Sequence, residues 1–214
     1  MPSLHNKFLT MDKKEILKKL HKLMTADETL PLRKGATNLV FGEGNPDAEI
    51  LFIGEGPGYW EDQKGRPFVG NAGSLLNQLL QSVKLDRESV FITNVIHYRP
   101  PANRDPLPEE IEAFQPYLDK IIEAINPKVI VTLGRFSMGK FLYGVKISSV
   151  HGKTHIVNWK DKELVVVPMY HPAAALRSQE IKLQLFEDFR NFIETFRKLK
   201  EEKKEKAIKQ MKLL

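Results

Sequence analysis

The sequence predicts an α/β protein, a three-layer sandwich with a central, mainly parallel four-stranded sheet flanked by helices. Four short runs consist almost entirely of Val, Ile, Leu and Phe, and the stretches between them carry apolar residues at helical spacing. Such runs are typical of strands buried on both faces, and their alternation with helices favours a parallel sheet covered on both sides. The predicted strands cover residues 49–54, 89–95, 128–134 and 163–169.

Helical spacing is clearest in three segments. Residues 72–83 place their apolar side chains on one side, and residues 109–125 do the same after a Pro-rich entry. The longest segment, residues 180–200, is amphipathic, and we expect its Lys-rich continuation to extend the helix and then fray. Further helices are predicted over residues 13–24 and 134–143.

Nothing in the composition divides the chain into several domains. The sequence has no internal repeat and no linker rich in Pro, Gly or Ser, so we expect one domain over residues 1–200 and a Lys-rich C-terminal tail over residues 201–214. No apolar run reaches the ~20 residues that a membrane span needs, and residues 1–18 lack the apolar core of a secretory signal. We therefore expect a cytoplasmic monomer that does not bind a membrane.

The positive charge is concentrated at the C-terminal end. The chain has a net charge of +6, and residues 197–214 hold eight basic and three acidic side chains, so this end accounts for five of the six charges. The rest of the chain is nearly neutral. A surface that binds nucleic acid would therefore depend on local clusters of basic residues rather than on the overall charge.

Polar side chains follow three of the predicted strands. Glu55 lies in the Gly-rich turn after the first strand, Asn94 closes the second, and His171 follows the fourth. Each has an ordinary explanation as a loop or turn residue when it is taken alone. In open parallel sheets, however, ligands bind beyond the carboxyl ends of the strands. The sequence therefore predicts a site built from these three side chains, although their spacing does not name a reaction.

An aromatic residue stands in an unusual setting after the first strand. Phe68 lies between Pro67 and Val69 in the glycine-rich segment 65–73, just ahead of a predicted helix. An isolated Phe is most often part of a core. In a loop this rich in glycine, a platform that stacks on a planar ligand is the better interpretation.

Five motifs in this region resemble those of the uracil-DNA glycosylase superfamily, and specifically its family 4 branch. The resemblance extends over residues 40–177, most of the chain, and the motifs follow in the family's order. They are GEGPG at 54–58, GRPFVGNAG at 65–73, TNV at 93–95, RPPANRDP at 99–106 and HPAAALR at 171–177. The resemblance implies a DNA repair enzyme that flips uracil out of DNA and hydrolyses its N-glycosidic bond, leaving an abasic site.

The resemblance also implies a role for each residue of the predicted site. Glu55 would position or activate the water that attacks the sugar, and His171 would stabilise the departing uracil. Gly56 would let its backbone meet the base, Phe68 would stack on it, and Asn94 would read its hydrogen-bonding edge. Cleavage develops positive charge on the sugar and negative charge on the base, and these residue types suit that chemistry without a metal or a cofactor.

The implied partner is uracil-containing DNA. Glu61 would crowd the C5 side of the base and exclude thymine, and Leu176 would press into the duplex as a wedge. Four arginines are candidate phosphate contacts, although an ordinary salt bridge is the alternative for each. They are Arg66, Arg99, Arg104 and Arg177.

The chain departs from the family in having no cysteine. Typical family 4 members hold a four-iron, four-sulfur cluster with four cysteines. Here Tyr98 and Phe114 stand at two of those positions, and residues 21–37 lack the other two cysteines. We expect the two rings to pack together as an apolar plug in place of the cluster. His97, where a lysine is common, is interpreted as a phosphate contact or a surface residue.

Two other functions stay open at this point. The chain could be a DNA-binding homologue that lost its activity together with the cluster, although such a protein would not need Glu55, Asn94 and His171. It could also be a suicide enzyme that traps the sugar through His97, although the basic insertion that marks that branch of the superfamily is missing. A gel assay on a uracil-containing oligonucleotide distinguishes the three.

Overall fold

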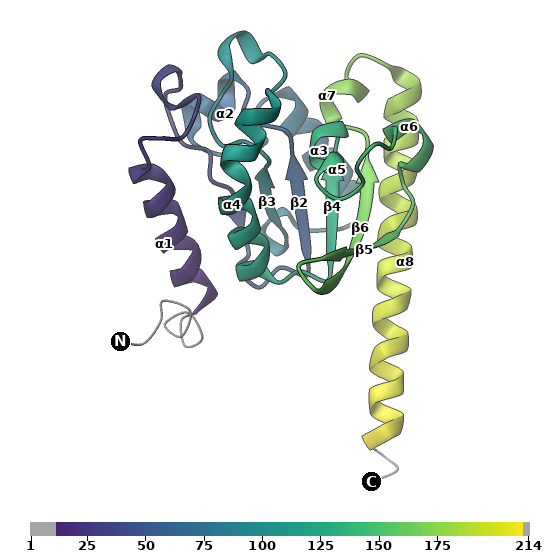
Figure 1. The fold of residues 1–214 in the computed structure, drawn as a ribbon. Helices are drawn as coiled ribbons and strands as arrows, with labels where there is room; N and C mark the ends of the chain where they lie inside the picture. Colours follow the sequence, from purple (N-terminus) through teal and green to yellow (C-terminus); the bar gives the residue numbers. More distant parts are fainter. Residues whose placement is uncertain (1–11, 212–214) are drawn as a thin grey trace, which may run out of the picture.

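The computed structural model describes residues 12–211, so both ends of the predicted domain and tail, residues 1–11 and 212–214, lie outside the described part. The sheet has six strands in the order β1-β3-β2-β4-β6-β5 (Figure 1). The four inner strands are parallel and coincide with the four predicted ones, which confirms the mainly parallel sheet. They are β2 (Ile50–Gly54), β3 (Phe91–Asn94), β4 (Val129–Leu133) and β6 (Lys162–Met169).

The two edge strands run antiparallel to their neighbours and were not predicted. β1 (Glu43–Gly44) pairs with β3, and β5 (His155–Trp159) pairs with β6. β1 has only two residues and β5 has no fully buried residue, so neither produces the continuous apolar run that marks the inner strands. The sheet therefore has six strands where four were expected.

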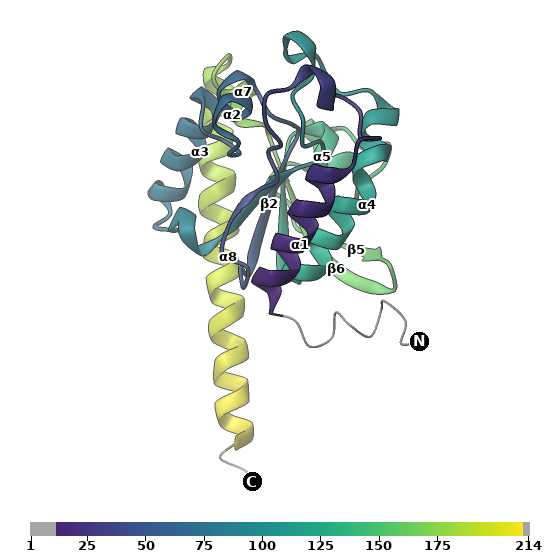
Figure 2. The ribbon, with the colours of Figure 1, turned by 90° about the vertical axis from the view of Figure 1, so that its left-hand side faces the viewer.

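Helices cover both faces of the sheet, as Figure 2 shows. One layer contains α1 (Lys13–Ala26) and α4 (Pro108–Ile125), and the opposite layer contains α3 (Asn71–Ser82) and part of α8 (Gln179–Met211). Each layer forms its own apolar core with one face of the sheet. Every residue of β2, β3 and β4 is buried between the layers. The predicted three-layer sandwich is confirmed.

Short helices occupy the connections near the carboxyl ends of the strands, at the top of Figure 1. The helix predicted over residues 134–143 is shorter in the structure, where α5 spans Arg135–Gly139. The remaining short elements are α2 (Tyr59–Lys64), α6 (Ile147–Val150), α7 (Pro172–Ala175) and the 3₁₀ turns η2 (Arg33–Gly35) and η4 (Pro101–Asn103). A further 3₁₀ turn, η3 (Arg87–Ser89), comes just before β3, at the amino end of that strand.

The last helix continues beyond the body of the protein. α8 runs without a break past residue 200, and its C-terminal part projects below the sheet in Figures 1 and 2. The division into a domain ending at residue 200 and a separate tail therefore stays a prediction. Between residues 12 and 211, no helix is long and apolar enough to cross a membrane.

Tyr98 packs against Phe114 of α4, in the apolar core on the side of the sheet that α1 and α4 cover. Their ring centroids are 6.1 Å apart at an interplanar angle of 56°, and both side chains are buried. Leu30, from the segment that lacks the first two family cysteines, belongs to the same apolar cluster. The predicted packing of Tyr98 against Phe114 is confirmed. Because the chain has no cysteine to ligate iron, the residues present do not fit a cysteine-bound iron–sulfur cluster.

Removing one ring of this plug should destabilise the protein without touching the strand-end residues. Phe114 is fully buried, so Phe114→Ala leaves a cavity, and we expect it to lower the free energy of unfolding by about 3–5 kcal/mol. Phe114→Leu fills most of that space and should lower the free energy of unfolding by clearly less than Phe114→Ala does. Urea unfolding at neutral pH measures both values, and equal losses for the two variants would show that packing is not the cause.

His97 lies in this core, so the interpretation of a surface residue or phosphate contact is wrong. The residue is fully buried, and its ring lies 5.6 Å from that of Phe114 and 6.2 Å from that of Phe41. Its Nδ1 donates to the Val40 carbonyl at 3.0 Å, and burial lowers its pKa to about 4. The apolar residues Val95 and Ile96, which precede His97, were the sequence signal that this segment is buried.

Candidate active site

A cavity of about 490 Å³ opens at the carboxyl ends of the inner strands. Glu55, Asn94 and His171 all line it, so the structure brings together the three side chains that the sequence placed at strand ends. Gly134, which follows β4, lines the same cavity. Each of the four parallel strands therefore delivers a residue to one site, as the topology of such sheets favours.

The carboxyl group of Glu55 titrates near neutral pH. Burial is the main cause that raises its pKa to about 7, and the negative charge of Asp105 raises it further. Arg135 and Arg177 partly oppose this shift. A carboxyl group poised near neutrality can accept a proton from a bound water once it is ionised.

Asn94 presents an unsatisfied acceptor next to the cavity. Its side chain is buried, and in the described part of the chain its Oδ1 has no hydrogen-bond partner. A Cβ at Gly54 would lie 2.5 Å from this oxygen and 2.6 Å from the ring of Phe68, so only glycine fits between them. An unpaired buried amide oxygen is costly unless a ligand supplies an N–H donor.

His171 is held as a neutral ring with a defined tautomer. Its Nδ1 accepts a hydrogen bond from the backbone N–H of Ala173 at 3.1 Å, which caps α7. Burial lowers the pKa of His171 to about 4, so the ring is uncharged at neutral pH. Since Nδ1 is an acceptor, the proton is on Nε2, and the ring can act as a donor there.

Phe68 closes one side of the site in a constrained conformation. Its ring centroid lies 5.7 Å from that of His171, and its φ of +51° is in the left-handed region that a side chain rarely adopts. Gly73 allows this arrangement, because a Cβ there would lie 1.9 Å from the Phe68 carbonyl oxygen. The aromatic face is thus fixed beside the cavity.

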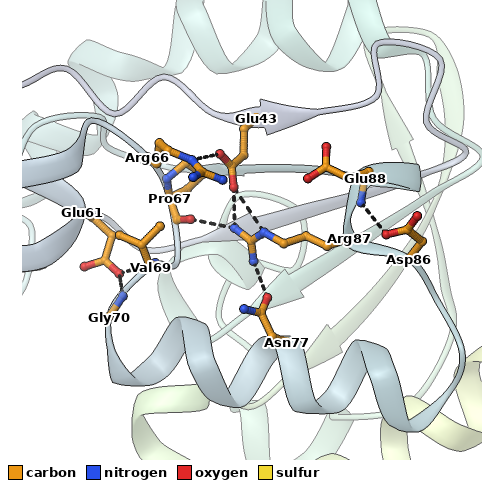
Figure 3. A network of polar contacts seen from close by, with 10 residues as sticks. All are labelled: Glu43, Glu61, Arg66, Pro67, Val69, Gly70, Asn77, Asp86, Arg87 and Glu88. Atoms are coloured by element: carbon orange, nitrogen blue, oxygen red, sulfur yellow. Dashed lines mark hydrogen bonds and ion pairs between the residues drawn. The ribbon is translucent and has the colours of Figure 1, made fainter.

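Glu61 lines the cavity and also holds the Phe68 loop. Its Oε1 accepts hydrogen bonds from the backbone N–H groups of Val69 at 2.8 Å and Gly70 at 2.7 Å (Figure 3). Gly56 lines the cavity too, and a Cβ there would lie 2.5 Å from Ile96. Packing against Ile96 therefore requires glycine at this position, and the contact of the Gly56 backbone with the base stays a prediction.

The predicted DNA-contact residues differ in their surroundings. Arg104 and Arg177 line the cavity, but Arg104 already donates two hydrogen bonds to Glu110. Arg66 is paired with Glu43 and Arg99 with Asn103, and neither lines the cavity. Leu176, at the end of α7, is 50% exposed and lies next to Arg177 in the chain.

Sequence reasoning missed an ion pair at the rim of the cavity. Asp105 and Arg135 both line the cavity and form a salt bridge with each other. Arg135 directly follows the third predicted strand, and that position was a usable signal. Asp105 has no such signal, because it is a loop residue that approaches Glu55 only in the folded chain.

No metal site accompanies these residues in the part of the chain that the structure describes. Across residues 12–211 no group of three or more His, Asp or Glu side chains is arranged to hold an ion, and cysteine is absent from the sequence. The side chains that line the cavity include a carboxyl group, an amide, a neutral imidazole and an aromatic ring.

Comparisons with known proteins agree with this geometry. The model of the uracil DNA glycosylase superfamily matches residues 41–200. A type-4 uracil-DNA glycosylase of Sulfurisphaera tokodaii is 50% identical over 165 residues, 74% of each chain. The type-4 uracil-DNA glycosylase of Archaeoglobus fulgidus is 48% identical over 74% of this chain and 82% of its own length. That of Thermotoga maritima is 46% identical over 74% of this chain and 83% of its own length. The chain therefore belongs to the uracil-DNA glycosylase superfamily and, within it, to the type-4 group.

Proposed function

We propose that this protein excises uracil from DNA by hydrolysing the N-glycosidic bond and leaves an abasic site. The buried, unpaired Oδ1 of Asn94 carries this proposal, because it lies in a cavity with a neutral histidine, a carboxyl group and an aromatic ring. Several relatives that match most of the chain are named type-4 uracil-DNA glycosylases, which supports the same activity.

Recognition of the base rests on Phe68 and Asn94. Phe68 stacks on the flipped base, while the amide of Asn94 accepts from N3–H of uracil and donates to O4. Cytosine presents the opposite pattern at these two positions and would leave the buried amide unpaired. Such mismatched polar groups discriminate far more strongly than shape alone. Glu61 limits the space at C5 and thereby disfavours thymine.

Bond cleavage uses His171 and Glu55 on opposite sides of the scissile bond. The Nε2–H of His171 donates to O2 of the departing base, where negative charge develops. The ionised carboxylate of Glu55 orients a water and accepts its proton as the water attacks the sugar C1′. Its charge also stabilises the positive character of the sugar. Burial strengthens both interactions because the cavity excludes bulk water.

Arg104, Arg177 and Leu176 form the proposed contact with the DNA around the flipped nucleotide. We expect Leu176→Ala to slow excision from double-stranded DNA about tenfold, because the wedge compensates part of the few kcal/mol needed to unstack the base. Excision from single-stranded DNA should change little. Leu199→Ala, at an equally exposed leucine of α8 near Lys128 at the start of β4, is the matched control. An equal defect on both substrates would contradict the wedge.

The proposed activity is tested on a uracil-containing oligonucleotide. The wild-type protein should produce sites that break on alkali treatment, and Asn94→Ala should lose this activity while remaining folded. Bound but uncut DNA would instead indicate the inactive DNA-binding homologue. A band that resists denaturation would indicate covalent trapping, which the complete burial of His97 opposes.

The organisation of the protein in solution is part of the proposal. We propose that residues 1–200 act as a single domain with a Lys-rich tail and that the protein is a cytoplasmic monomer. The motif-bearing segments all contribute to one sheet and one cavity, which supports a single unit. Light scattering at micromolar concentration tests the monomer.

A further inference from the structure

The loop that carries Phe68 is held from both sides by side chains outside it (Figure 3). Before Phe68, Nη2 of Arg87 donates a hydrogen bond to the Pro67 carbonyl at 2.8 Å. After Phe68, Glu61 accepts hydrogen bonds from the N–H groups of Val69 and Gly70. The backbone is therefore fixed on each side of the aromatic residue.

Arg87 is itself held in place by two further contacts. Its Nε and Nη2 donate to Oε1 of Glu43 at 3.2 and 2.7 Å, and its Nη1 donates to Oδ1 of Asn77 in α3 at 2.8 Å. Burial alone would raise the pKa of Glu43, but the hydrogen bonds from Arg66 and Arg87 lower it below its ordinary value. Glu43 is therefore a carboxylate that orients the guanidinium. The network joins the edge strand β1, the turn η3, helix α3 and the loop.

The conformation of Phe68 explains why such a network is needed. A left-handed backbone is unfavourable for a phenylalanine and persists only where the surroundings enforce it. Arg87 is mostly buried, with its side chain 18% exposed, and its planar guanidinium bonds three partners at once. A free loop would be expected to return Phe68 to an ordinary backbone region and to move the ring away from His171.

We propose that Arg87, oriented by Glu43, is a positioning residue that holds the Phe68 ring at the angle required to stack on the flipped base. The proposal rests on the proposed function, since it assigns the network to base recognition. Arg87 touches neither the cavity nor the DNA in this role; it acts only through the Pro67 carbonyl.

A double-mutant cycle tests this role. Stacking on an aromatic residue contributes ~1–3 kcal/mol per base, so Phe68→Ala should weaken inhibition by free uracil by about 5- to 150-fold. Arg87→Met should weaken it about fivefold, with affinity for uracil-free DNA unchanged. In the Phe68→Ala background, Arg87→Met should then have no further effect on uracil inhibition or on single-turnover excision. Additive losses would overturn the proposal.

A matched variant separates positioning from stability. Arg197 also donates to backbone carbonyls of a loop, those of Val83 and Lys84, which directly follow the C-terminal end of α3. Arg197→Met should lower the melting temperature but leave uracil inhibition as it is in the wild type. Arg87→Lys should restore little of the inhibition by free uracil, because an ammonium group cannot bond Glu43, Asn77 and Pro67 in one plane.

Hydrogen exchange tests the network whether or not the protein excises uracil. In Arg87→Met the amides of Val69 and Gly70 should exchange faster than in the wild type, while those of the inner strands keep their protection. If these two amides remain protected, the network does not hold the loop and the proposal fails. If they lose protection and the wild type has no glycosylase activity, the proposed function fails and the positioning of Phe68 stands.

Discussion

Replacing Glu55 by Gln should lower the rate of uracil excision by about 10²–10⁴-fold, the contribution expected of a general base. Gln keeps the shape of the side chain but cannot accept the proton of the attacking water or stabilise a positive sugar. Single-turnover assays measure the loss, and uracil inhibition should remain near the wild-type value because the base contacts are intact. A loss below about threefold would contradict the role of Glu55.

The wild-type rate should rise with pH as Glu55 ionises. Since burial raises the pKa of Glu55 to about 7, the reactive carboxylate is scarce below that pH and predominates above it. The rate constant of excision should therefore increase through pH 7, and Glu55→Gln should lose this dependence. Asp105→Asn removes a charge that raises this pKa, so it should move the rise to lower pH.

The same carboxyl group should make the protein less stable at neutral pH than in weakly acidic solution. The folded pKa of Glu55, about 7, exceeds its ordinary value of 4.5, so between these pH values the folded protein keeps a proton that the unfolded chain has released. The contribution of Glu55 to stability therefore declines as the pH rises through that interval. At pH 8, Glu55→Gln should melt at a higher temperature than the wild type, and at pH 4 the difference should disappear.

The inner sheet was predictable because burial on both faces leaves a local signal. β2 and β4 are runs of five residues with no exposed position, and nothing but a buried strand or a short core helix explains such a run. β1 lacks that signal, since Glu43 and Gly44 form a strand only because they pair with the edge of β3. Its existence depends on tertiary pairing, which no short window of sequence contains.

The residues of the site that stand at the ends of strands were predictable from the sequence, and those that lie in loops were not. Asn94 closes β3 and His171 comes two residues after β6, so the rule for parallel sheets located both, while Phe68 depended on the motif resemblance. Arg87 and Pro67 are twenty residues apart and joined by a side-chain bond, which no periodicity records. The catalytic and recognition roles of these residues stay predictions until the variants are measured.

His97 shows how a local comparison can mislead. A histidine that replaces a basic residue near a predicted DNA-binding motif was interpreted as a surface group. In the structure the ring of His97 is buried and packs on Phe114, in the core that also contains Tyr98. Tyr98 and Phe114 belong to one apolar cluster, and the buried ring of His97 packs against Phe114 in the same core.

Replacing His171 by Ala should lower the rate of excision by about 10²–10³-fold, the effect expected when one donor to a developing anion is removed. The donor is the Nε2–H of a neutral ring, so the loss should be nearly constant from pH 6 to 9, well above the pKa of about 4. The substitution also removes the cap that Ala173 N–H uses, and the melting temperature must therefore be measured alongside the rate.

The decisive measurement varies the leaving group. A 5-fluorouracil base carries negative charge more easily than uracil and needs less help from a donor. If His171 stabilises the departing base, the defect of His171→Ala should be several-fold smaller on DNA containing 5-fluorouracil. The defect of Glu55→Gln, which concerns the water and the sugar, should persist on both substrates. Equal His171→Ala defects on the two bases would mean that this residue only positions the nucleotide, because a positioning contact does not depend on the charge that the base develops.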